Sequence, residues 1–294
     1  MRGFRLLVVL SAVASSGLLA GSAAAKPKPR NRPVVPGSQY LALGDSVTFG
    51  YMESTVTPTP NYHDAASFPG YPEQLGKALH LRVANAACPG ETSSSLVNLN
   101  GPSNGCENNP GHTSNNYRTL YPLHVSYKGS QLAYALSYLK RHHRVRLVSL
   151  MIGANDFFVC EETTSDGCAS TGERNAVTQT VTKNIHTILS SIREKAHYRG
   201  QIVIVNYYSL NYASSSVNAQ SQLLNQVQDA AAKPYGVKIA DGYGEFQAAT
   251  AHSGDNTCTA GLLTQTGGGK CGIHPSYAGQ ALLAQAVAKR IKLG

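Results

Sequence analysis

Five short apolar segments, separated by longer stretches with helical periodicity, constrain the fold of this chain most strongly. They are residues 40–43, 81–84, 145–152, 202–205 and 237–240. The third and fourth are apolar at nearly every position, as in strands that are buried on both faces. Strands that alternate with helices form parallel sheets with right-handed crossovers. We therefore expect an α/β fold, a three-layer sandwich around a five-stranded parallel sheet in flavodoxin-like order.

The expected helices lie between these strands and after the last one. Residues 171–196 have the clearest helical spacing of apolar side chains, and the other helical patterns cover residues 71–80, 131–140, 215–232 and 276–293. Long loops at residues 52–68, 88–128 and 157–170 follow the first three strands. They should crowd the carboxyl edge of the sheet, where parallel sheets bind their ligands.

The amino-terminal region has the pattern of an export signal followed by a linker. Residues 1–25 combine a basic start, an apolar middle and an Ala-rich end, which predicts a secretory signal peptide and an extracellular protein. Residues 26–37 are rich in Pro, Lys and Arg and predict a disordered linker, so residues 38–294 should form one catalytic domain. No later segment is apolar over enough residues to cross a membrane, and we expect no stable membrane insertion.

The basic net charge gives no support for nucleic-acid binding. Six of the positive charges lie in residues 1–37, and removing them from the formal +9 leaves +3 for the expected domain. The sequence also contains no C-x-x-C or H-E-x-x-H motif, so we expect neither a metal nor another cofactor. We expect a monomer.

The expected exported part contains six cysteines, an even number that favours three disulfides. Fifteen pairings are possible. We favour nearest-neighbour pairing because each such pair brackets a loop-like stretch rich in Gly, Asn, Ser or Thr. The predicted disulfides are Cys88–Cys106, Cys160–Cys168 and Cys258–Cys271.

Four short motifs with catalytic potential occur at strand ends or before the last helix. They are Gly44-Asp45-Ser46, the Gly90 segment after the second strand, Gly153-Ala154-Asn155-Asp156, and Gly272-Ile273-His274-Pro275. In this order and on these elements, they resemble the markers of the SGNH (GDSL) hydrolase family. The resemblance spans nearly the whole expected domain. It implies catalytic roles for Ser46, Gly90, Asn155 and His274.

The chemistry of ester hydrolysis agrees with this resemblance. Ser46 can attack an ester carbonyl if His274 accepts the hydroxyl proton. The backbone N–H groups of Ser46 and Gly90, with the side-chain amide of Asn155, could bind the oxyanion. Asp45 and Asp156 are interpreted as structural residues that bond turn backbone. Gly101-Pro102-Ser103-Asn104-Gly105 also matches the nucleophile elbow G-x-S-x-G, but it lacks a flanking strand and helix, so Ser103 is an unfavourable nucleophile.

One position departs from the family pattern. The family usually has an Asp three residues before the catalytic His, and this chain has Cys271 there. Some secreted bacterial members use a Ser–His dyad in which a backbone carbonyl bonds the other imidazole nitrogen. The resemblance therefore favours the carbonyl of Cys271 or Gly272 as the group that orients His274. Asp255 and Asp241 are the alternatives.

The motifs indicate the reaction and leave the substrate open. We expect a secreted serine carboxylester hydrolase, a lipase or esterase and possibly a phospholipase A, that cleaves medium or long acyl esters. Tyr residues at 51, 62, 117, 121, 207 and 208 could line its acyl groove. The alternatives are a carbohydrate acetylesterase and a secreted binding protein whose catalytic site has decayed.

Overall fold

A computed structural model describes residues 32–111 and 116–294 of the chain. Its centre is a five-stranded parallel sheet with the strand order β2-β1-β3-β4-β5, which confirms the predicted fold class and order. The strands are β1 (Gln39–Gly44), β2 (Arg82–Asn85), β3 (Val145–Met151), β4 (Gln201–Val205) and β5 (Lys238–Ala240). All five residues of β4 are buried, as expected for a strand that is covered on both faces.

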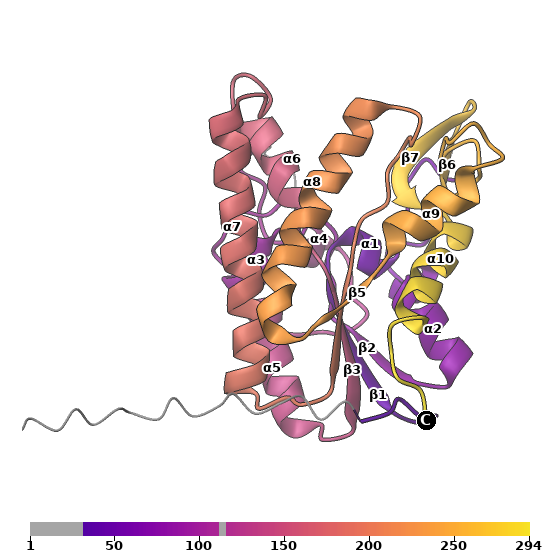
Figure 1. Cartoon of the computed structure of the whole chain (residues 1–294). Coiled ribbons are helices and arrows are strands. Elements are labelled where there is room, and N and C mark those ends of the chain that lie inside the picture. Colours follow the sequence, from indigo (N-terminus) through magenta and orange to yellow (C-terminus); the bar gives the residue numbers. More distant parts are fainter. Residues whose placement is uncertain (1–31, 112–115) are drawn as a thin grey trace, which may run out of the picture.

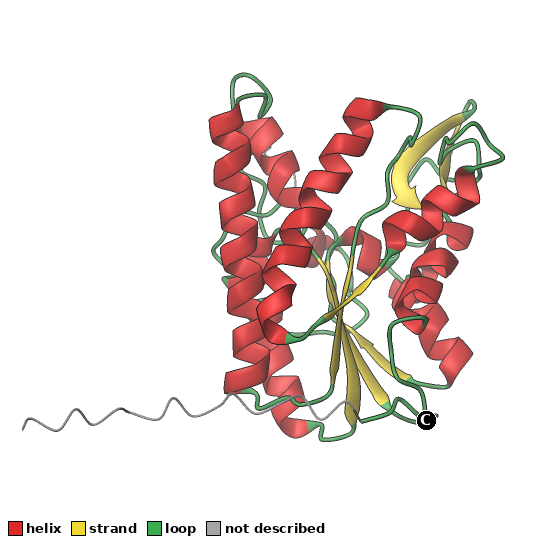
Figure 2. Cartoon of the chain, in the orientation of Figure 1, coloured by secondary structure: helices red, strands yellow, loops and turns green. Residues whose placement is uncertain are grey.

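Helices cover both faces of the sheet (Figures 1 and 2). One layer contains α2 (Tyr71–Leu79), α9 (Gly242–Thr250) and α10 (Tyr277–Ala288), which contact one another through α10. The opposite layer contains α3 (Ser93–Val97), α5 (Gln131–Arg141), α7 (Thr171–Ser190) and α8 (Ser215–Ala232). The remaining helices, α1 (Ser46–Phe49), α4 (Tyr117–Leu120) and α6 (Ala154–Thr163), follow the strands or lie in the long loops.

Three short helical segments accompany these helices, one in the loop before α2 and one each directly after α7 and α8. They are η1 (Ala65–Ser67), η2 (Ser191–Lys195) and η3 (Lys233–Tyr235). The helix expected over residues 171–196 widens into a π-helix at η2. There the buried Arg193 donates hydrogen bonds through Nη1 to the carbonyls of Tyr198 and Gly200.

The structure contains a two-stranded hairpin that the sequence patterns did not predict. Strands β6 (Leu263–Gly267) and β7 (Lys270–Pro275) pair antiparallel just before α10. Gly267, Gly268 and Gly269 between them all have positive φ, a conformation that glycine adopts without steric cost. The hairpin stands beside the carboxyl edge of the sheet, across from the upper ends of α6, α7 and α8 (Figure 1).

The described part of the predicted linker is packed against the domain. Val34 is buried, and its N–H donates to the carbonyl of Lys292 at 2.9 Å. Val34 also forms a β-bridge with Leu293. The packed unit therefore begins before Ser38, and disorder is the wrong prediction for residues 32–37. The predicted signal peptide, residues 1–25, and residues 26–31 of the linker lie outside the described residues.

Candidate active site

Ser46 is the first residue of α1, in a sharp turn at the end of β1. Asp45 caps this helix, because its Oδ1 accepts from the backbone N–H of Val47 at 3.0 Å. Gly44 makes the turn possible: a Cβ at this position would lie 2.3 Å from the carbonyl oxygen of Met151. The Ser46 side chain is left half-buried at the carboxyl edge of the sheet.

His274 lies on β7 and reaches Ser46 from 228 positions away in the chain. The distance from Nε2 of His274 to Oγ of Ser46 is 3.0 Å, which is hydrogen-bond distance. The His274 side chain is 12% exposed, and the ring of Tyr51 packs edge-on against it with 4.9 Å between the centroids. The hairpin that the sequence did not predict therefore carries the imidazole to the predicted nucleophile.

The other imidazole nitrogen pairs with a carboxylate that the sequence did not reveal. Oε1 of Glu53 lies 2.8 Å from Nδ1 of His274. The same oxygen accepts from the backbone N–H of Ile273 at 3.1 Å, and Oε2 accepts from the hydroxyl of Thr264 at 2.5 Å. Glu53 is thus bonded to both strands of the hairpin. A carboxylate at Nδ1 fixes the ring orientation and the tautomer in which Nε2 can accept a proton.

The prediction of a backbone carbonyl or an aspartate at Nδ1 of His274 is therefore wrong. Glu53 occupies the position at Nδ1 of His274 that was expected for the backbone carbonyl of Cys271 or Gly272. The side chain of Cys271 forms the disulfide with Cys258. Asp255 is exposed, and Asp241 caps α9 by accepting from the N–H of Gly244 at 2.9 Å. The family pattern has its carboxylate three residues before the His and therefore does not predict Glu53. Glu53 lies in the loop after α1.

The contacts of Glu53 favour its charged form. Partial burial opposes ionisation, but the hydrogen bond and positive charge available from His274 outweigh it and lower the pKa of Glu53 to about 2. The carboxyl group is therefore ionised at neutral pH. An ionised carboxylate stabilises an imidazolium more than a backbone carbonyl does.

The two further predicted oxyanion donors lie at the same cleft as Ser46 and His274. Gly90 has φ of +83°, and a Cβ there would lie 2.1 Å from the carbonyl oxygen of Asn104. Asn155 is buried at the start of α6, and its Nδ2 donates to the carbonyl of Glu91 at 3.0 Å. Within residues 32–111 and 116–294, no acceptor is hydrogen-bonded to the backbone N–H of Ser46 or of Gly90.

Asp45 and Asp156 are buried carboxyl groups next to these residues. Asp45 bonds its own turn, as predicted, whereas Asp156 bonds the distant Ser93 on α3. Asp45 also accepts from the hydroxyl of Tyr207, and Asp156 accepts from both the N–H and the hydroxyl of Ser93, at 2.7 and 2.6 Å. Burial raises the pKa of each to about 6, although these hydrogen bonds oppose the shift.

A cleft of about 870 Å³ opens beside Ser46 and His274. Its lining is mainly apolar, and much of it comes from α6, the 167–169 loop, residues 207–210, α8 and β7. The principal apolar residues are Phe157, Phe158, Leu210, Val217, Leu223, Leu224 and Ile273. Of the tyrosines expected at a groove, Tyr51, Tyr117, Tyr207 and Tyr208 line the cleft, whereas Tyr62 and Tyr121 pack in the aromatic cluster behind Tyr51.

All three predicted disulfides are present, with S–S distances of 2.00 Å for Cys88–Cys106, 1.96 Å for Cys160–Cys168 and 1.99 Å for Cys258–Cys271. Two of them approach a glutamate, but their sulfurs are bonded to each other and cannot act as thiolate ligands of a metal. Ser103 is fully buried, and its hydroxyl donates to the carbonyl of Asn108 at 2.6 Å, as its unfavourable flanks predicted.

Comparison with known proteins agrees with this geometry. The model of the GDSL-like lipase/acylhydrolase family matches residues 42–282. No curated protein matches the chain. A phospholipase A1 from Streptomyces albidoflavus has a similar structure, with 21% identity, a TM-score of 0.53 and coverage of 86% of this chain and 99% of that one.

Two other solved structures share the fold. An α/β hydrolase from the metagenome of Lake Arreo has 16% identity and a TM-score of 0.51, with 87% of this chain and 95% of that chain covered. An acetylxylan esterase from Geobacillus stearothermophilus has 14% identity and a TM-score of 0.50, with 88% and 95% covered. At these identities the likeness establishes the fold.

The fold and the family match define the protein as a hydrolase of the esterase and lipase class, built on an α/β fold with a parallel sheet. The chain belongs to the GDSL-like lipase/acylhydrolase family. Among the helices of the described residues, none is both long and apolar enough to span a membrane.

Proposed function

We propose that this protein is an exported carboxylester hydrolase with a Ser46–His274–Glu53 catalytic triad. The observation that carries the proposal is the continuous hydrogen-bond chain from Ser46 Oγ through the imidazole of His274 to Glu53, with distances of 3.0 and 2.8 Å. A nucleophile, a base and a group that orients the base are the components of nucleophilic acyl transfer. The three disulfides support export, because such bonds persist in oxidising compartments.

The reaction begins when Ser46 Oγ attacks the ester carbonyl carbon and its proton passes to Nε2 of His274. The carbonyl oxygen becomes an oxyanion, which the N–H groups of Ser46 and Gly90 and the amide of Asn155 stabilise. His274 then gives its proton to the departing alcohol oxygen as the C–O bond breaks and an acyl-enzyme forms. Water, deprotonated by Nε2 of His274, then attacks the acyl carbon. The bond from this carbon to Ser46 Oγ breaks, His274 returns the proton to Oγ, and the acid leaves. Glu53 stabilises the imidazolium in both halves of the cycle.

The cleft favours esters with a medium or long acyl chain. Its volume of about 870 Å³ and its apolar walls exceed what an acetyl group needs. The structural neighbours include a phospholipase A1 and an acetylxylan esterase, so this fold serves both lipid and carbohydrate esters. The carboxylate of Glu53 lies at Nδ1 of His274, so the missing aspartate before His274 no longer favours a decayed binding protein.

The test is a series of p-nitrophenyl esters from acetyl to palmitoyl, assayed with the wild type, Ser46→Ala and Ser216→Ala. Ser216 is the matched control because it lines the cleft and its hydroxyl pairs with Ser214 instead of an imidazole. We expect an optimum beyond butyrate that disappears in Ser46→Ala and persists in Ser216→Ala. An acetyl-only profile would favour a carbohydrate acetylesterase, and equal rates for the wild type and Ser46→Ala would refute the triad.

A further inference from the structure

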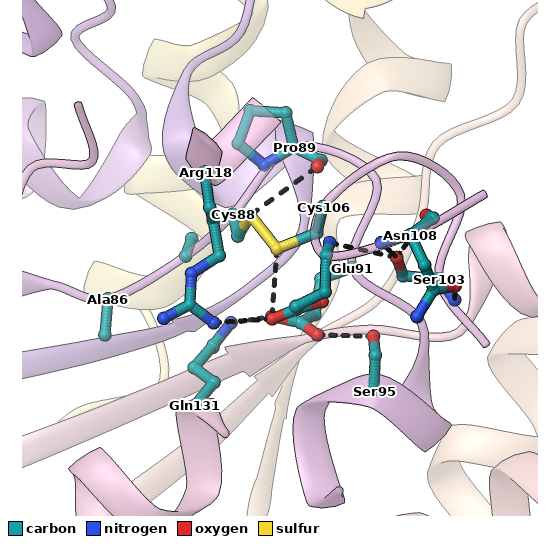
Figure 3. The surroundings of a disulfide bond; sticks show 12 residues. Ala86, Cys88, Pro89, Glu91, Ser95, Ser103, Cys106, Asn108, Arg118 and Gln131 are labelled. Carbon is teal, nitrogen blue, oxygen red and sulfur yellow. Dashed lines mark hydrogen bonds and ion pairs between the residues drawn. A yellow bond between two sulfur atoms is a disulfide. The ribbon is translucent and has the colours of Figure 1, made fainter. Parts of the chain in front are cut away.

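Gln131, the first residue of α5, connects the nucleophile turn to the Gly90 loop. Its side chain is fully buried and makes three hydrogen bonds. Oε1 accepts from the N–H of Gly44 at 2.6 Å, and Nε2 donates to the carbonyl of Gly44 at 3.0 Å. Nε2 also donates to Oε2 of Glu91 at 2.9 Å (Figure 3). One amide group therefore holds both main-chain polar atoms of Gly44 and a carboxylate of the neighbouring loop.

Glu91 is the other half of this connection. It is fully buried and follows Gly90 directly. Its Oε1 accepts from the hydroxyl of Ser95 (Figure 3). Its backbone carbonyl accepts from Nδ2 of Asn155 at 3.0 Å. The side chain of Glu91 thus fixes the loop to α3 and α5, while its main chain holds the third expected oxyanion donor.

We propose that Gln131 and Glu91 are positioning residues that hold the oxyanion donors of Ser46, Gly90 and Asn155 in register. This inference rests on the proposed function. Gly44 stands two residues before Ser46, and Glu91 is bonded covalently to Gly90 and through its carbonyl to Asn155. The Gln131–Glu91 hydrogen bond joins the two halves, so that each donor is connected to the others through buried contacts.

The cost of burying a carboxylate argues that Glu91 has a specific role. Burial, with the nearby Glu107, raises the pKa of Glu91 well above its usual range. An apolar side chain of similar volume would fill the same space without this cost. The carboxyl group instead makes hydrogen bonds through both oxygens in defined directions, which fixes the position of the loop. Beside it, the Cys88–Cys106 disulfide and the Arg118–Glu107 ion pair of 2.7 Å close the same loop.

Oxyanion binding is sensitive to small displacements of its donors. The donors act at about 2.7–3.1 Å from the oxyanion, and removing one typically lowers kcat by about 10²–10³-fold. A shift of about 1 Å in catalytic geometry can cost about 10²-fold. Loosening the Gln131–Glu91 connection should therefore lower kcat while the acyl cleft, and with it KM, changes little.

The test compares Gln131→Met, Glu91→Leu and Glu91→Gln with the wild type. Gln131→Met keeps the side-chain length and removes all three hydrogen bonds. Glu91→Gln keeps an oxygen that can accept from Gln131, so it should retain more activity than Glu91→Leu and serves as the conservative rescue. We expect Gln131→Met and Glu91→Leu to lower kcat by about 10- to 10²-fold with KM nearly unchanged, and to weaken inhibition by an alkyl boronic acid by a similar factor.

Gln201→Met is the matched structural control. Gln201 is also buried and makes three hydrogen bonds, to Arg32 O, Lys292 O and Lys292 N, but it lies at the amino-terminal end of β4. The Gln201→Met variant should have a lower thermal stability than the wild type and the same kcat. If Gln131→Met loses stability as Gln201→Met does but keeps the wild-type kcat and boronate affinity, the positioning role is refuted and the triad stands. If Ser46→Ala is as active as the wild type, the proposed function fails and this inference with it.

Discussion

Glu53 and His274 are 221 positions apart in the chain, yet 2.8 Å separates Oε1 of the first from Nδ1 of the second. The contact joins the loop after α1 to the β6–β7 hairpin. Glu53 also bonds Ile273 and Thr264, one on each strand of the hairpin. One side chain therefore both anchors the element that carries the imidazole and supplies the charge that faces it.

The first prediction separates these two roles of Glu53. Glu53→Gln keeps an acceptor for Nδ1 and for Ile273 and a donor for Thr264, so the hairpin should stay in place. The imidazolium, however, loses its negative partner. We expect kcat to fall by roughly 10²- to 10⁴-fold with little change in KM, measured on the preferred p-nitrophenyl ester.

The control for this experiment is Glu245→Gln. Glu245 also pairs with a cationic side chain, Lys289, at 2.6 Å, but it lies on α9 near the surface. It should leave kcat unchanged. Wild-type kcat in Glu53→Gln would mean that the carboxylate acts only as a tether for the hairpin.

The second prediction concerns the backbone of Gly90. Gly90→Ala introduces a Cβ at 2.1 Å from the carbonyl oxygen of Asn104, in a backbone with φ of +83°. Gly105→Ala is the matched control, because φ is +97° there and no atom lies within 4 Å of the added Cβ. Both variants should lose about 1–2 kcal/mol of unfolding free energy from the left-handed backbone.

Gly90→Ala should in addition displace the N–H donor and lower kcat by about 10²-fold or more. Steady-state kinetics and urea unfolding of both variants measure the two effects. Equal kcat in Gly90→Ala and Gly105→Ala would remove Gly90 from the oxyanion site.

The third prediction is a pH dependence of stability that comes from the buried carboxyl groups. The pKa of Asp156 is raised by burial from 3.8 to about 6, so the native state binds its proton more tightly than the unfolded chain does. The free energy of unfolding is therefore expected to fall as the pH rises from about 4 to about 6. Above that range Asp156 is ionised in both states, and the free energy of unfolding falls no further on its account. A shift of about two pKa units corresponds to about 3 kcal/mol.

Asp156→Asn removes this titration and keeps an acceptor for the N–H of Ser93. The variant should gain stability relative to the wild type on going from pH 4 to pH 7, measured by urea unfolding at each pH. Asp45→Asn should behave in the same direction, since burial also raises the pKa of Asp45 to about 6. Parallel stability curves for the wild type and both variants would contradict the prediction.

The fourth prediction compares two disulfides. Cys258→Ser with Cys271→Ser opens the bridge that ends in the strand of His274, and Cys160→Ser with Cys168→Ser opens one at the rim of the cleft. Loss of either should destabilise the protein by about 2–4 kcal/mol. On an acetyl or butyryl ester, the first double variant should lose kcat and the second should keep it. The same kcat for both would show that the 258–271 bridge has no part in placing His274.

The fifth prediction tests which wall of the cleft holds the acyl chain. Val217→Trp adds bulk to the face of α8 that lines the cleft, whereas Gln226→Trp adds it to an exposed position on the same helix. Val217→Trp should shift the optimum to shorter acyl chains, because a longer chain would lose apolar contacts worth about 1–3 kcal/mol each. Acetyl esters do not extend as far into the cleft and should keep nearly the wild-type kcat/KM. An unchanged chain-length profile in Val217→Trp would place the acyl chain elsewhere.

The local pattern of the sequence was sufficient for the fold, and its motifs contain two residues that the structure brings together. Apolar runs such as 202–205 are buried strands, and the motif residues Ser46 and His274 come within 3.0 Å of each other. The fold prediction succeeds because hydrophobic period and turn chemistry are properties of neighbouring residues. The nearest-neighbour disulfides succeed for a similar reason, since each closes a short loop.

The partner of His274 could not be predicted in this way. Glu53 belongs to no motif and lies in a long loop after α1, where a carboxylate usually faces solvent. The partners expected for His274 all lie nearer to it in the sequence than Glu53 does. The hairpin strands β6 and β7 were also not predicted, because three consecutive glycines interrupt their alternating pattern. No sequence pattern predicts the buried Gln131–Glu91 hydrogen bond either.

The alternating strands and helices, the tight turn at Ser46 and the family can all be recognised in the amino-acid sequence, and nearest-neighbour pairing of the cysteines is favoured there. The pairing of Glu53 with Nδ1, the Gln131–Glu91 hydrogen bond and the apolar cleft beside α6 and α8 become visible only once the chain has folded. The physical reason is that such contacts depend on where whole elements pack, and a side chain far away in the chain can satisfy a buried polar group as well as a near one.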